Sequence, residues 1–386
     1  MGSGRMSRYE PRAFRLVLGA ICLIATTLGT AGAEDAWPAV PRVVAIGDVH
    51  GDFGQLVTVL KDAGLVDAKL KWTGGKTHLV QTGDRIDRGS LSRKVMDLLM
   101  RLEKDAKKAG GMVHPLLGNH EAMNMLGDLR YVTPEEFAAF KGTDSQRYRD
   151  ALWEQRREER KQRGEAAPTE ADRKRFDAEI PLGYIEHRLA FAPKGVYGAW
   201  LVRQNAVIRI GDTLFLHGGI SPKYADFSLA DLNEKIRREL QDPDPLTALL
   251  AQDPEGPLWY RGLAQGDPAL LPHLEGVLAR HGCRRIVIGH TPTEGFLVFP
   301  RYGGRVLMID VGLSKYYGGP PAALILEGGQ AFALHRGKRL PLPDAEGEPL
   351  LRYVREVSAL EPDPSRLKPL LGRLEEAAAT AAPSPP

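Results

Sequence analysis

Short apolar runs recur along this chain. Most of them end at a glycine, or at a threonine followed by glycine, and polar residues come next. They constrain its fold more than any other feature. Each run has four or five residues and is rich in valine, isoleucine or leucine. Runs of this length and composition, bounded by glycine, are typical of buried strands. Five of them are residues 43–46, 78–81, 113–117, 213–216 and 285–288.

Apolar residues at helical spacing separate the first three runs. Residues 56–63 present one apolar face that ends at Gly64, and residues 91–102 present another that ends before Gly110. Strand–helix–strand alternation indicates an α/β layered fold. A hairpin is predicted over residues 207–216, with Gly211-Asp212 as its turn. Residues 306–309 and 322–326 predict further strands, so we expect two mixed sheets in a sandwich flanked by helices.

Residues 1–33 have the features of a secretory signal peptide. Arg12 and Arg15 precede an apolar run over residues 16–28, and Ala31-Gly32-Ala33 is a small-x-small cleavage site. The run is short and contains threonine and glycine, so an uncleaved membrane anchor is the less favoured alternative. We expect export to a bacterial periplasm, with no stable membrane insertion after cleavage.

The net charge gives no support for nucleic-acid binding, and the cysteine count excludes an intramolecular disulfide in the exported chain. The formal net charge of +3 comes from the first 33 residues, which hold four arginines and one glutamate, so the remainder is balanced. Bulk charge therefore gives no support for nucleic-acid binding. Of the 2 cysteines, Cys22 lies in the signal region. The exported chain keeps only Cys283 and can form no intramolecular disulfide.

The chain is expected to form one main domain over residues 34–345 and a C-terminal extension over residues 346–386, with a disordered Ala- and Pro-rich end. Residues 141–180 are dense in charges of both signs and are interrupted at Gly164 and Pro168. This composition favours a solvated helical hairpin. The alternative is a cap over a site, with Tyr148, Trp153 or Phe176 in contact with substrate.

Polar side chains follow the predicted strands at the points where these strands end. In α/β sheets, sites form beyond the carboxyl ends of strands. Six oxygen and nitrogen donors at one edge are more than a single metal ion needs beside solvent, whereas two ions that share a bridging carboxylate would use all six. The six donors are Asp48, His50, Asp84, Asn119, His217 and His290.

The same stretches carry a family resemblance. "GDVHG", "GDRIDRG", "GNHE" and "HGG", followed by "GH", resemble the signature blocks of the PPP-type, calcineurin-like metallophosphatases, in the family's order from Gly47 to His290. "GVYGAWL" and "IDVGLSKYYGG" are similar to its Shewanella-like protein phosphatase branch. The resemblance implies a calcineurin-like metallophosphoesterase fold, and it makes residues 34–345 the catalytic domain of a metal-dependent phosphomonoester hydrolase.

The family's pattern implies a role for each matching residue. Asp48 and His50 would bind one metal ion, and Asp84 would bridge two. Asn119, His217 and His290 would bind the second ion. His120 would be the general acid, oriented by Asp87. Arg88, Arg261 and Asn119 would contact the substrate phosphate, although the flanks of Arg261 differ from those in the Ser/Thr enzymes. Glu121 is expected to help place its neighbours.

The implied chemistry explains why an amide stands at position 119. Two divalent ions about 3.5–4 Å apart would bind phosphate oxygens and lower the pKa of a bridging water, whose hydroxide would attack phosphorus in line. With Asp48, Asp84 and this hydroxide the site keeps a positive net charge, which a third carboxylate would cancel. Mixed oxygen and nitrogen donors suit Mn, Fe or Zn.

Three alternatives remain beside a protein phosphatase. These are a diadenosine tetraphosphate hydrolase, another phosphodiesterase of the superfamily, and a non-enzymatic module that binds phosphate or phosphopeptides. Asp87-Arg88-Gly89 and Glu121 argue against the first, and the complete set of family residues argues against the last. The expected partner is a phosphorylated protein or a small phosphoester, and the branch is associated with phosphotyrosine.

Overall fold

The strands form two six-stranded sheets, and the predicted sandwich of two mixed sheets is confirmed. The computed structural model describes residues 34–381, so the predicted signal peptide and Cys22 lie outside the described residues. Sheet A has the strand order β1-β5-β6-β7-β9-β8, and sheet B has the order β12-β11-β10-β2-β3-β4. The strands are β1 Ala36–Trp37, β2 Arg42–Ile46, β3 His78–Gln81, β4 Met112–Pro115, β5 Val207–Ile210, β6 Thr213–Leu216, β7 Arg285–Ile288, β8 Phe299–Arg301, β9 Val306–Met308, β10 Ala322–Glu327, β11 Gln330–His335 and β12 Lys338–Pro341.

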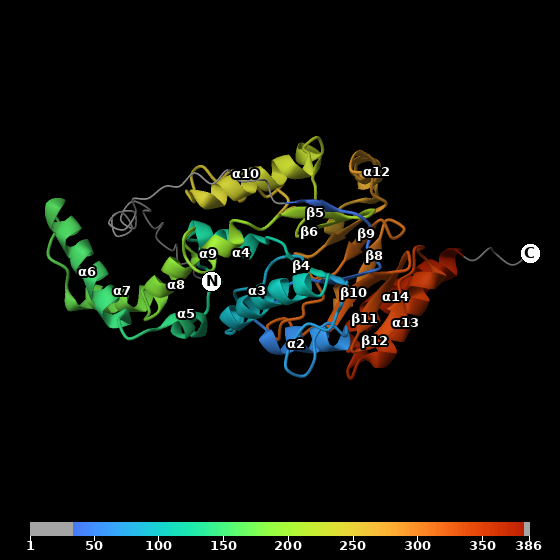
Figure 1. Ribbon diagram of the computed structural model, residues 1–386, viewed down its shortest axis with the longest axis horizontal. Helices are drawn as coiled ribbons and strands as arrows, with labels where there is room; N and C mark the ends of the chain where they lie inside the picture. Colours follow the sequence, from blue (N-terminus) through green and yellow to red (C-terminus); the bar gives the residue numbers. More distant parts are fainter. Residues whose placement is uncertain (1–33, 382–386) are drawn as a thin grey trace, which may run out of the picture. The chain divides into compact units, whose positions relative to one another are not determined.

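Helices cover the outer sides of the two sheets. The helices α10 and α12 lie over sheet A, and α2, α3, α13 and α14 lie over sheet B (Figure 1). None of the helices within residues 34–381 combines the length and apolar content needed to cross a bilayer. The α-helices are α2 Phe53–Asp62, α3 Ser92–Lys108, α4 Asn119–Leu126, α5 Pro134–Phe140, α6 Ser145–Gln162, α7 Glu170–Glu179, α8 Tyr184–Phe191, α9 Gly198–Leu201, α10 Leu229–Gln241, α11 Gly262–Gln265, α12 Leu271–Arg280, α13 Glu348–Leu360 and α14 Lys368–Ala381.

Parallel pairing brings the carboxyl ends of the central strands together. In sheet B, β2 pairs with β3 and β3 with β4 in parallel. In sheet A, β6 pairs with β7 and β7 with β9 in the same way. Every residue of β3, β6 and β7 is buried, as expected for strands covered on both faces. The loops that follow these strands therefore meet at one region of the sandwich.

Two predicted boundaries differ from the structure. The predicted strand 113–117 ends at Pro115, because the chain then leaves sheet B and the Leu117 N–H donates to the Asn205 carbonyl at 2.9 Å. The helix predicted from Leu91 begins at Ser92 instead, and the Leu91 side chain is 38% exposed. The strands β1, β8, β11 and β12 were not predicted. The strands β1, β8 and β12 are short and lie at sheet edges, where burial imposes little apolar pattern. The strand β11 lies inside sheet B, but the first three of its six residues are not buried.

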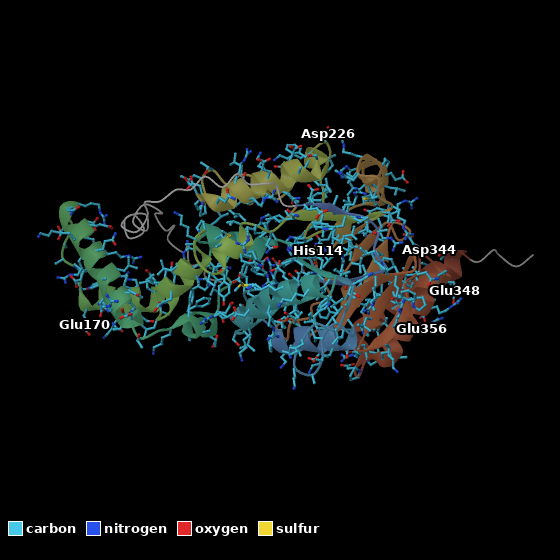
Figure 2. The ribbon with its side chains drawn as sticks, in the orientation of Figure 1. His114, Glu170, Asp226, Asp344, Glu348 and Glu356 are labelled. Atoms are coloured by element: carbon cyan, nitrogen blue, oxygen red, sulfur yellow. The ribbon has the colours of Figure 1, made fainter. Side chains whose placement is uncertain are left out.

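The charged segment forms a helical hairpin within a larger insert, which comprises helices α5 to α8. Trp153 of α6 and Phe176 of α7 pack against each other with ring centroids 5.1 Å apart, so both rings lie inside the hairpin. Charged side chains cover α6 and α7, including Glu170 at the start of α7 (Figure 2). The insert joins the rest of the chain through α5 and α8, whose Phe137 and His187 rings lie 5.3 Å apart.

The C-terminal extension is tied to the sheets by a buried acid. Glu361, which follows α13, accepts hydrogen bonds from His335 Nε2 at 2.7 Å and from Arg336 Nε at 3.0 Å. Arg366 donates to Glu361 at 3.2 Å and to the Gly318 carbonyl at 2.9 Å. The helix α14 continues through Ala381, further than the Ala-rich composition indicated. Residues 382–386, the rest of the predicted disordered end, lie outside the described residues.

We predict that acid weakens the fold through His187 in the insert. Burial lowers the pKa of His187 to about 3, so the folded protein holds this imidazole in its neutral form. The unfolded chain takes up a proton near pH 6.5, and stability is therefore lost as the pH falls below that value, by about 2 kcal/mol at pH 5. Among the described residues, His187 Nδ1 has no hydrogen-bond partner, so His187→Phe should fold. Urea unfolding at pH 7 and pH 5 should show a smaller loss for His187→Phe than for the wild type. Equal losses would contradict the prediction.

Candidate metal centre

The sequence-predicted donors come together where the two sheets meet. Sheet B contributes Asp48 and His50 after β2 and Asp84 after β3, and Asn119 begins α4 after β4. Sheet A contributes His217 after β6 and His290 after β7. All six side chains are buried, with no more than 5% of any residue exposed. The packing of one sheet on the other therefore builds the cluster.

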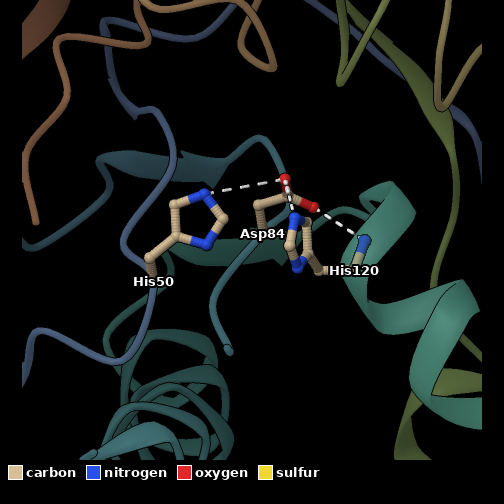
Figure 3. Close-up of side chains that lie close together, drawn as sticks. All are labelled: His50, Asp84 and His120. Carbon is tan, nitrogen blue, oxygen red and sulfur yellow. Dashed lines mark hydrogen bonds and ion pairs between the residues drawn. The ribbon is translucent and has the colours of Figure 1, made fainter. Parts of the chain in front are cut away.

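The Asp84 carboxylate is the centre of the cluster. Its Oδ2 atom lies 3.2 Å from His217 Nε2, 3.8 Å from His120 Nε2 and 3.9 Å from His50 Nε2. The imidazoles of His50 and His120 both face this carboxylate (Figure 3). Burial acts to raise the pKa of Asp84, but the charges of His217 and then His120 outweigh burial and hold the pKa well below its usual range. A carboxylate that stays ionised among imidazoles is suited to bridge two cations.

The outer nitrogens of three histidines are fixed by backbone carbonyls. His50 Nδ1 lies 3.0 Å from the Ile86 carbonyl, and His217 Nδ1 lies 2.9 Å from the Thr82 carbonyl. His290 Nε2 lies 3.0 Å from the Trp259 carbonyl. Histidines that bind metals typically donate one ring N–H to such an acceptor, which leaves the other nitrogen for the ion. The donor set and its orientation therefore fit divalent metal ions.

His120 differs from these histidines, although it lies in the same cluster. Ligand atoms of His50, Asp84 and His120 lie within 4.8 Å of one another, as do those of Asp84, His217 and His290, so both groups could hold an ion. However, His120 Nε2 lies 3.3 Å from the Arg88 guanidinium, and a cation there would be repelled. Asp48 is another carboxylate beside this group, with its Oδ2 atom 4.0 Å from His50 Nε2.

A hydrogen-bonded chain orients the His120 imidazole. Its Nδ1 atom lies 2.6 Å from Asp87 Oδ2, and Asn124 Nδ2 donates to both Asp87 oxygens at 3.0 Å. Burial acts to lower the pKa of His120, but the charges of Asp84 and Asp87 outweigh burial and raise this pKa. His120 Nε2 is therefore held toward Arg88 and Asp84 in a form able to carry a proton.

Three tyrosine rings surround the Arg88 side chain. Its guanidinium carbon lies 5.0 Å from the centre of the Tyr131 ring, 5.1 Å from Tyr317 and 5.5 Å from Tyr316. Tyr131 and Tyr316 are 40% and 66% exposed. Arg88 thus lies between the buried cluster and the surface, inside an open ring of aromatic side chains. The sequence pattern gave no indication of this ring.

The second predicted phosphate ligand lies on the opposite side of the cluster. Arg261 Nη1 donates to the His290 carbonyl at 2.9 Å and to Thr291 Oγ1 at 3.0 Å. It is therefore next to a predicted metal ligand, and its contact with phosphate stays a prediction. The other six histidines belong to neither of the two groups that could hold an ion: His78, His114, His187, His273, His281 and His335.

Asp310 is a site residue that sequence reasoning missed. It is 1% exposed, and its carboxyl interacts with that of Asp48. Burial raises the pKa of Asp310 to about 6, and the Gly312 N–H donates to its Oδ1 at 3.0 Å. Asp310 follows β9 closely, so the rule that identified the other donors applies to it as well. It could have been found from its position after the strand at residues 306–309.

Several site residues have a left-handed backbone that L-residues rarely adopt. The φ angles are 44° at His50, 55° at Asp84, 69° at Asp87, 65° at Arg88 and 65° at His290. Such conformations cost on the order of 1 kcal/mol or more each and persist only where surrounding contacts enforce them. The tight turns direct these side chains into the cluster.

Glu121 supplies contacts that enforce the turn at Asp84. Its carboxylate accepts from the N–H groups of Asp84 at 2.9 Å, Arg85 at 2.8 Å and Gly118 at 2.8 Å. A larger residue does not fit in place of Gly118, because its Cβ atom would lie 2.3 Å from Asp84 Oδ1. The fully buried Arg85 guanidinium lies beside Glu121, with Nε 3.4 Å from Oε1. Glu121 therefore joins the loops after β3 and β4.

We predict that Glu121→Gln weakens both folding and metal binding. The substitution directs an amide NH₂ at N–H donors and leaves the buried Arg85 cation unpaired, which typically costs about 3–5 kcal/mol. Urea unfolding and metal analysis of the purified protein measure the two effects. Adding Arg85→Met should restore part of the stability but not the metal content, because the Asp84 and Gly118 N–H groups remain unpaired. Wild-type metal content in Glu121→Gln would contradict the prediction.

Comparisons with known proteins agree with this geometry. The family model described as calcineurin-like phosphoesterase matches residues 41–294. Shewanella-like protein phosphatase 2 of Arabidopsis thaliana is 31% identical over 71% of this chain and 72% of its own length. An uncharacterized protein of Schizosaccharomyces pombe is 33% identical over 81% of this chain and 86% of its own.

Solved structures of protein tyrosine phosphatases also resemble this chain. A cold-active protein tyrosine phosphatase of a psychrophilic Shewanella species superposes with a TM-score of 0.61, at 28% identity, over 83% of this chain and 87% of that chain. A structure of a cold-active protein tyrosine phosphatase at 1.1 Å superposes with a TM-score of 0.64, at 27% identity, over 83% and 82% of the two chains. The chain is a metal-dependent phosphatase and belongs to the calcineurin-like phosphoesterase family, in its Shewanella-like protein phosphatase branch.

Proposed function

We propose that this protein is a phosphomonoesterase that removes phosphate from phosphotyrosine in proteins. The observation that carries the proposal is the position of Arg88, 3.3 Å from His120 Nε2 and inside a ring of three tyrosines. A cation that binds phosphate, a proton donor and an aromatic surface thus lie together. The solved structures that resemble this chain at 27–29% identity are described as tyrosine phosphatases, which supports the same substrate.

Two metal ions are part of the proposal. Asp48 and His50 would hold one ion, Asn119, His217 and His290 the other, and Asp84 both. When bound, such ions neutralise phosphate oxygens and lower the pKa of water to generate a nucleophile. Asn119 would ligate through a neutral oxygen, so it would add no further negative charge to a site that already holds the carboxyl groups of Asp48, Asp84 and Asp310. Imidazole and carboxylate donors suit Mn, Fe or Zn.

The remaining residues act on the substrate itself. Arg88 presents a planar fork of N–H groups that matches two phosphate oxygens. His120 donates the proton on Nε2 to the leaving oxygen, which would otherwise depart as an anion. Asp87 keeps Nδ1 protonated and fixes the ring, and Asn124 fixes Asp87. Transfer of a proton by a positioned imidazole contributes roughly 10²–10⁴-fold to the rate.

The tyrosine ring explains why an aromatic ester is favoured. A phosphotyrosine ring can stack on Tyr131 or Tyr317 while its phosphate reaches Arg88, and aromatic pairs contribute about 0.5–1.5 kcal/mol each beyond area burial. Phosphoserine has no ring for these contacts. Tyr131 and Tyr316 are exposed at the surface and Tyr317 is half-buried beside them, so a phosphorylated side chain on a folded protein or peptide can reach this ring of tyrosines.

We also propose that the protein is exported to a periplasm after loss of residues 1–33. The support is the arginine-flanked apolar run and the Ala31-Gly32-Ala33 site. The N-terminal residue of the protein recovered from a bacterial periplasmic fraction tests this. Recovery of the uncut chain in the membrane fraction would favour the anchor instead.

We predict faster hydrolysis of phosphotyrosine peptides than of matched phosphoserine and phosphothreonine peptides in the presence of Mn²⁺. Tyr317→Leu should lower the ratio of kcat/KM for phosphotyrosine over phosphoserine by roughly 2- to 10-fold, since one aromatic contact is lost. Tyr148→Leu in the insert is the matched control and should leave the ratio unchanged. Equal rates on all three peptides would exclude the tyrosine preference, and activity only on dinucleotide polyphosphates would exclude the phosphomonoesterase.

We predict that one substitution removes proton donation without removing metal binding, and that others remove both. His120→Asn should keep the wild-type metal content and lose about 100-fold or more in kcat, and least for esters with good leaving groups, which need no proton. His217→Ala and Asn119→Ala should lose metal as well as activity. Metal analysis of the purified variants, together with kcat for a series of aryl phosphates, measures both. Loss of a metal ion from His120→Asn would show that His120 is a ligand.

A further inference from the structure

The turn that carries Asp87 and Arg88 makes two main-chain hydrogen bonds, one to the insert and one to the residues just before it. Both residues have left-handed backbone, with φ angles of 69° and 65°. The Asp87 N–H donates to Glu136 Oε1 at 3.2 Å, and the Arg88 N–H donates to the Tyr131 carbonyl at 3.1 Å. Tyr131 lies just before α5 and Glu136 lies within it. The insert and the residues just before it therefore hold two strained residues of the site.

Glu136 is part of the internal structure at this point. It is 2% exposed and lies in the first turn of α5, where it forms a capping box with Thr133. Ser92 Oγ, at the start of α3, also donates to Glu136 Oε1. One carboxyl group thus joins the insert, the helix α3 and the strained turn. A shift of α5 would move the acceptor of the Asp87 N–H.

The far end of the insert reaches Asp87 by a second, indirect route. Arg188 of α8 donates to the Asn124 carbonyl. The Asn124 side chain in turn donates to both carboxylate oxygens of Asp87 and to the His120 carbonyl, each at 3.0 Å. The insert therefore contacts Asp87 directly through Glu136, and Arg188 at its other end reaches Asp87 only indirectly, through Asn124 of α4.

We propose that Glu136 is a positioning residue for the Asp87–His120 pair, and that through it the insert sets the orientation of the proton donor. The inference rests on the proposed function, since it requires His120 to be the general acid. Without Glu136 Oε1, the Asp87 N–H has no acceptor and the left-handed turn loses a contact that enforces it. Misplacement of a reacting group by about 1 Å can cost roughly 100-fold in rate.

The test compares leaving groups in the metal-loaded enzyme. Glu136→Ala should lower kcat for phenyl phosphate, a poor leaving group, by about 10- to 100-fold, and should have little effect on 4-nitrophenyl phosphate. Metal content should not change. Glu135→Ala is the matched control, because Glu135 is the exposed neighbour on the same helix turn. It should resemble the wild type with both substrates.

The conservative variant separates positioning from folding. Burial and then the charge of Asp87 raise the pKa of Glu136 to about 8, so Gln is close to its form at neutral pH. Glu136→Gln keeps an oxygen for the Asp87 N–H, while its NH₂ group faces the Thr133 N–H in place of Oε2. The cap should therefore weaken, and kcat should stay within about threefold of the wild type. If the Ala variant does not fold, Glu136→Asp replaces it, since the shorter side chain withdraws the acceptor while keeping the cap.

A double-mutant cycle distinguishes the two proposals. If Glu136 acts through His120, then Glu136→Ala should have no further effect on kcat in the His120→Asn background. An equal loss in both backgrounds, or an equal loss for both leaving groups, would overturn the role of Glu136 while leaving the proposed function intact. Wild-type kcat in His120→Asn alone would instead overturn the general acid, and with it this inference.

Discussion

The convergence of three imidazoles on one buried carboxylate oxygen is the constraint on which this site depends. Asp84 Oδ2 lies within 3.9 Å of a nitrogen of His50, His120 and His217. Asp84 and His50 follow strands of sheet B, whereas His217 follows a strand of sheet A. The electrostatic centre is therefore complete only when the two sheets pack in register. Any ion bound there would link the sheets, so metal binding and the packing of the sandwich support each other.

A second constraint is the conformational free energy that the turns need to direct polar side chains into the site. Left-handed turns at Asp84, Asp87 and Arg88 are unfavourable by themselves. They persist because buried carboxyl groups accept their N–H groups: Glu121 accepts from Asp84, and Glu136 accepts from Asp87. Both acids lie in the first turns of helices, α4 and α5, and their positions are fixed by helix geometry. Acids at the starts of two helices thus hold the turns that carry Asp84 and Asp87.

Periodicity and strand-end position were enough to predict the sheets' central strands and the donors that meet at Asp84. The same reasoning missed Asp310, although it follows β9 and lies in the block "IDVGLSKYYGG", because the family's pattern gave no role to this position. It could not predict Glu136 either, since an acid in a first helical turn is common and only tertiary packing places this one against Asp87. The ring of Tyr131, Tyr316 and Tyr317 joins segments far apart in sequence, and no local pattern encodes such a meeting.

The hydrogen bonds around the buried Glu361 connect the C-terminal extension to the loop that follows Tyr316 and Tyr317. The family match ends at residue 294, yet Arg366 reaches from Glu361 to the Gly318 carbonyl, directly after Tyr316 and Tyr317. The segment beyond residue 345 therefore braces the loop that carries Tyr316 and Tyr317, two of the three rings around Arg88. Relatives that share every metal ligand but differ in this extension could diverge in the substrates they admit. Selection on substrate choice can thus act on residues that never approach the metal centre.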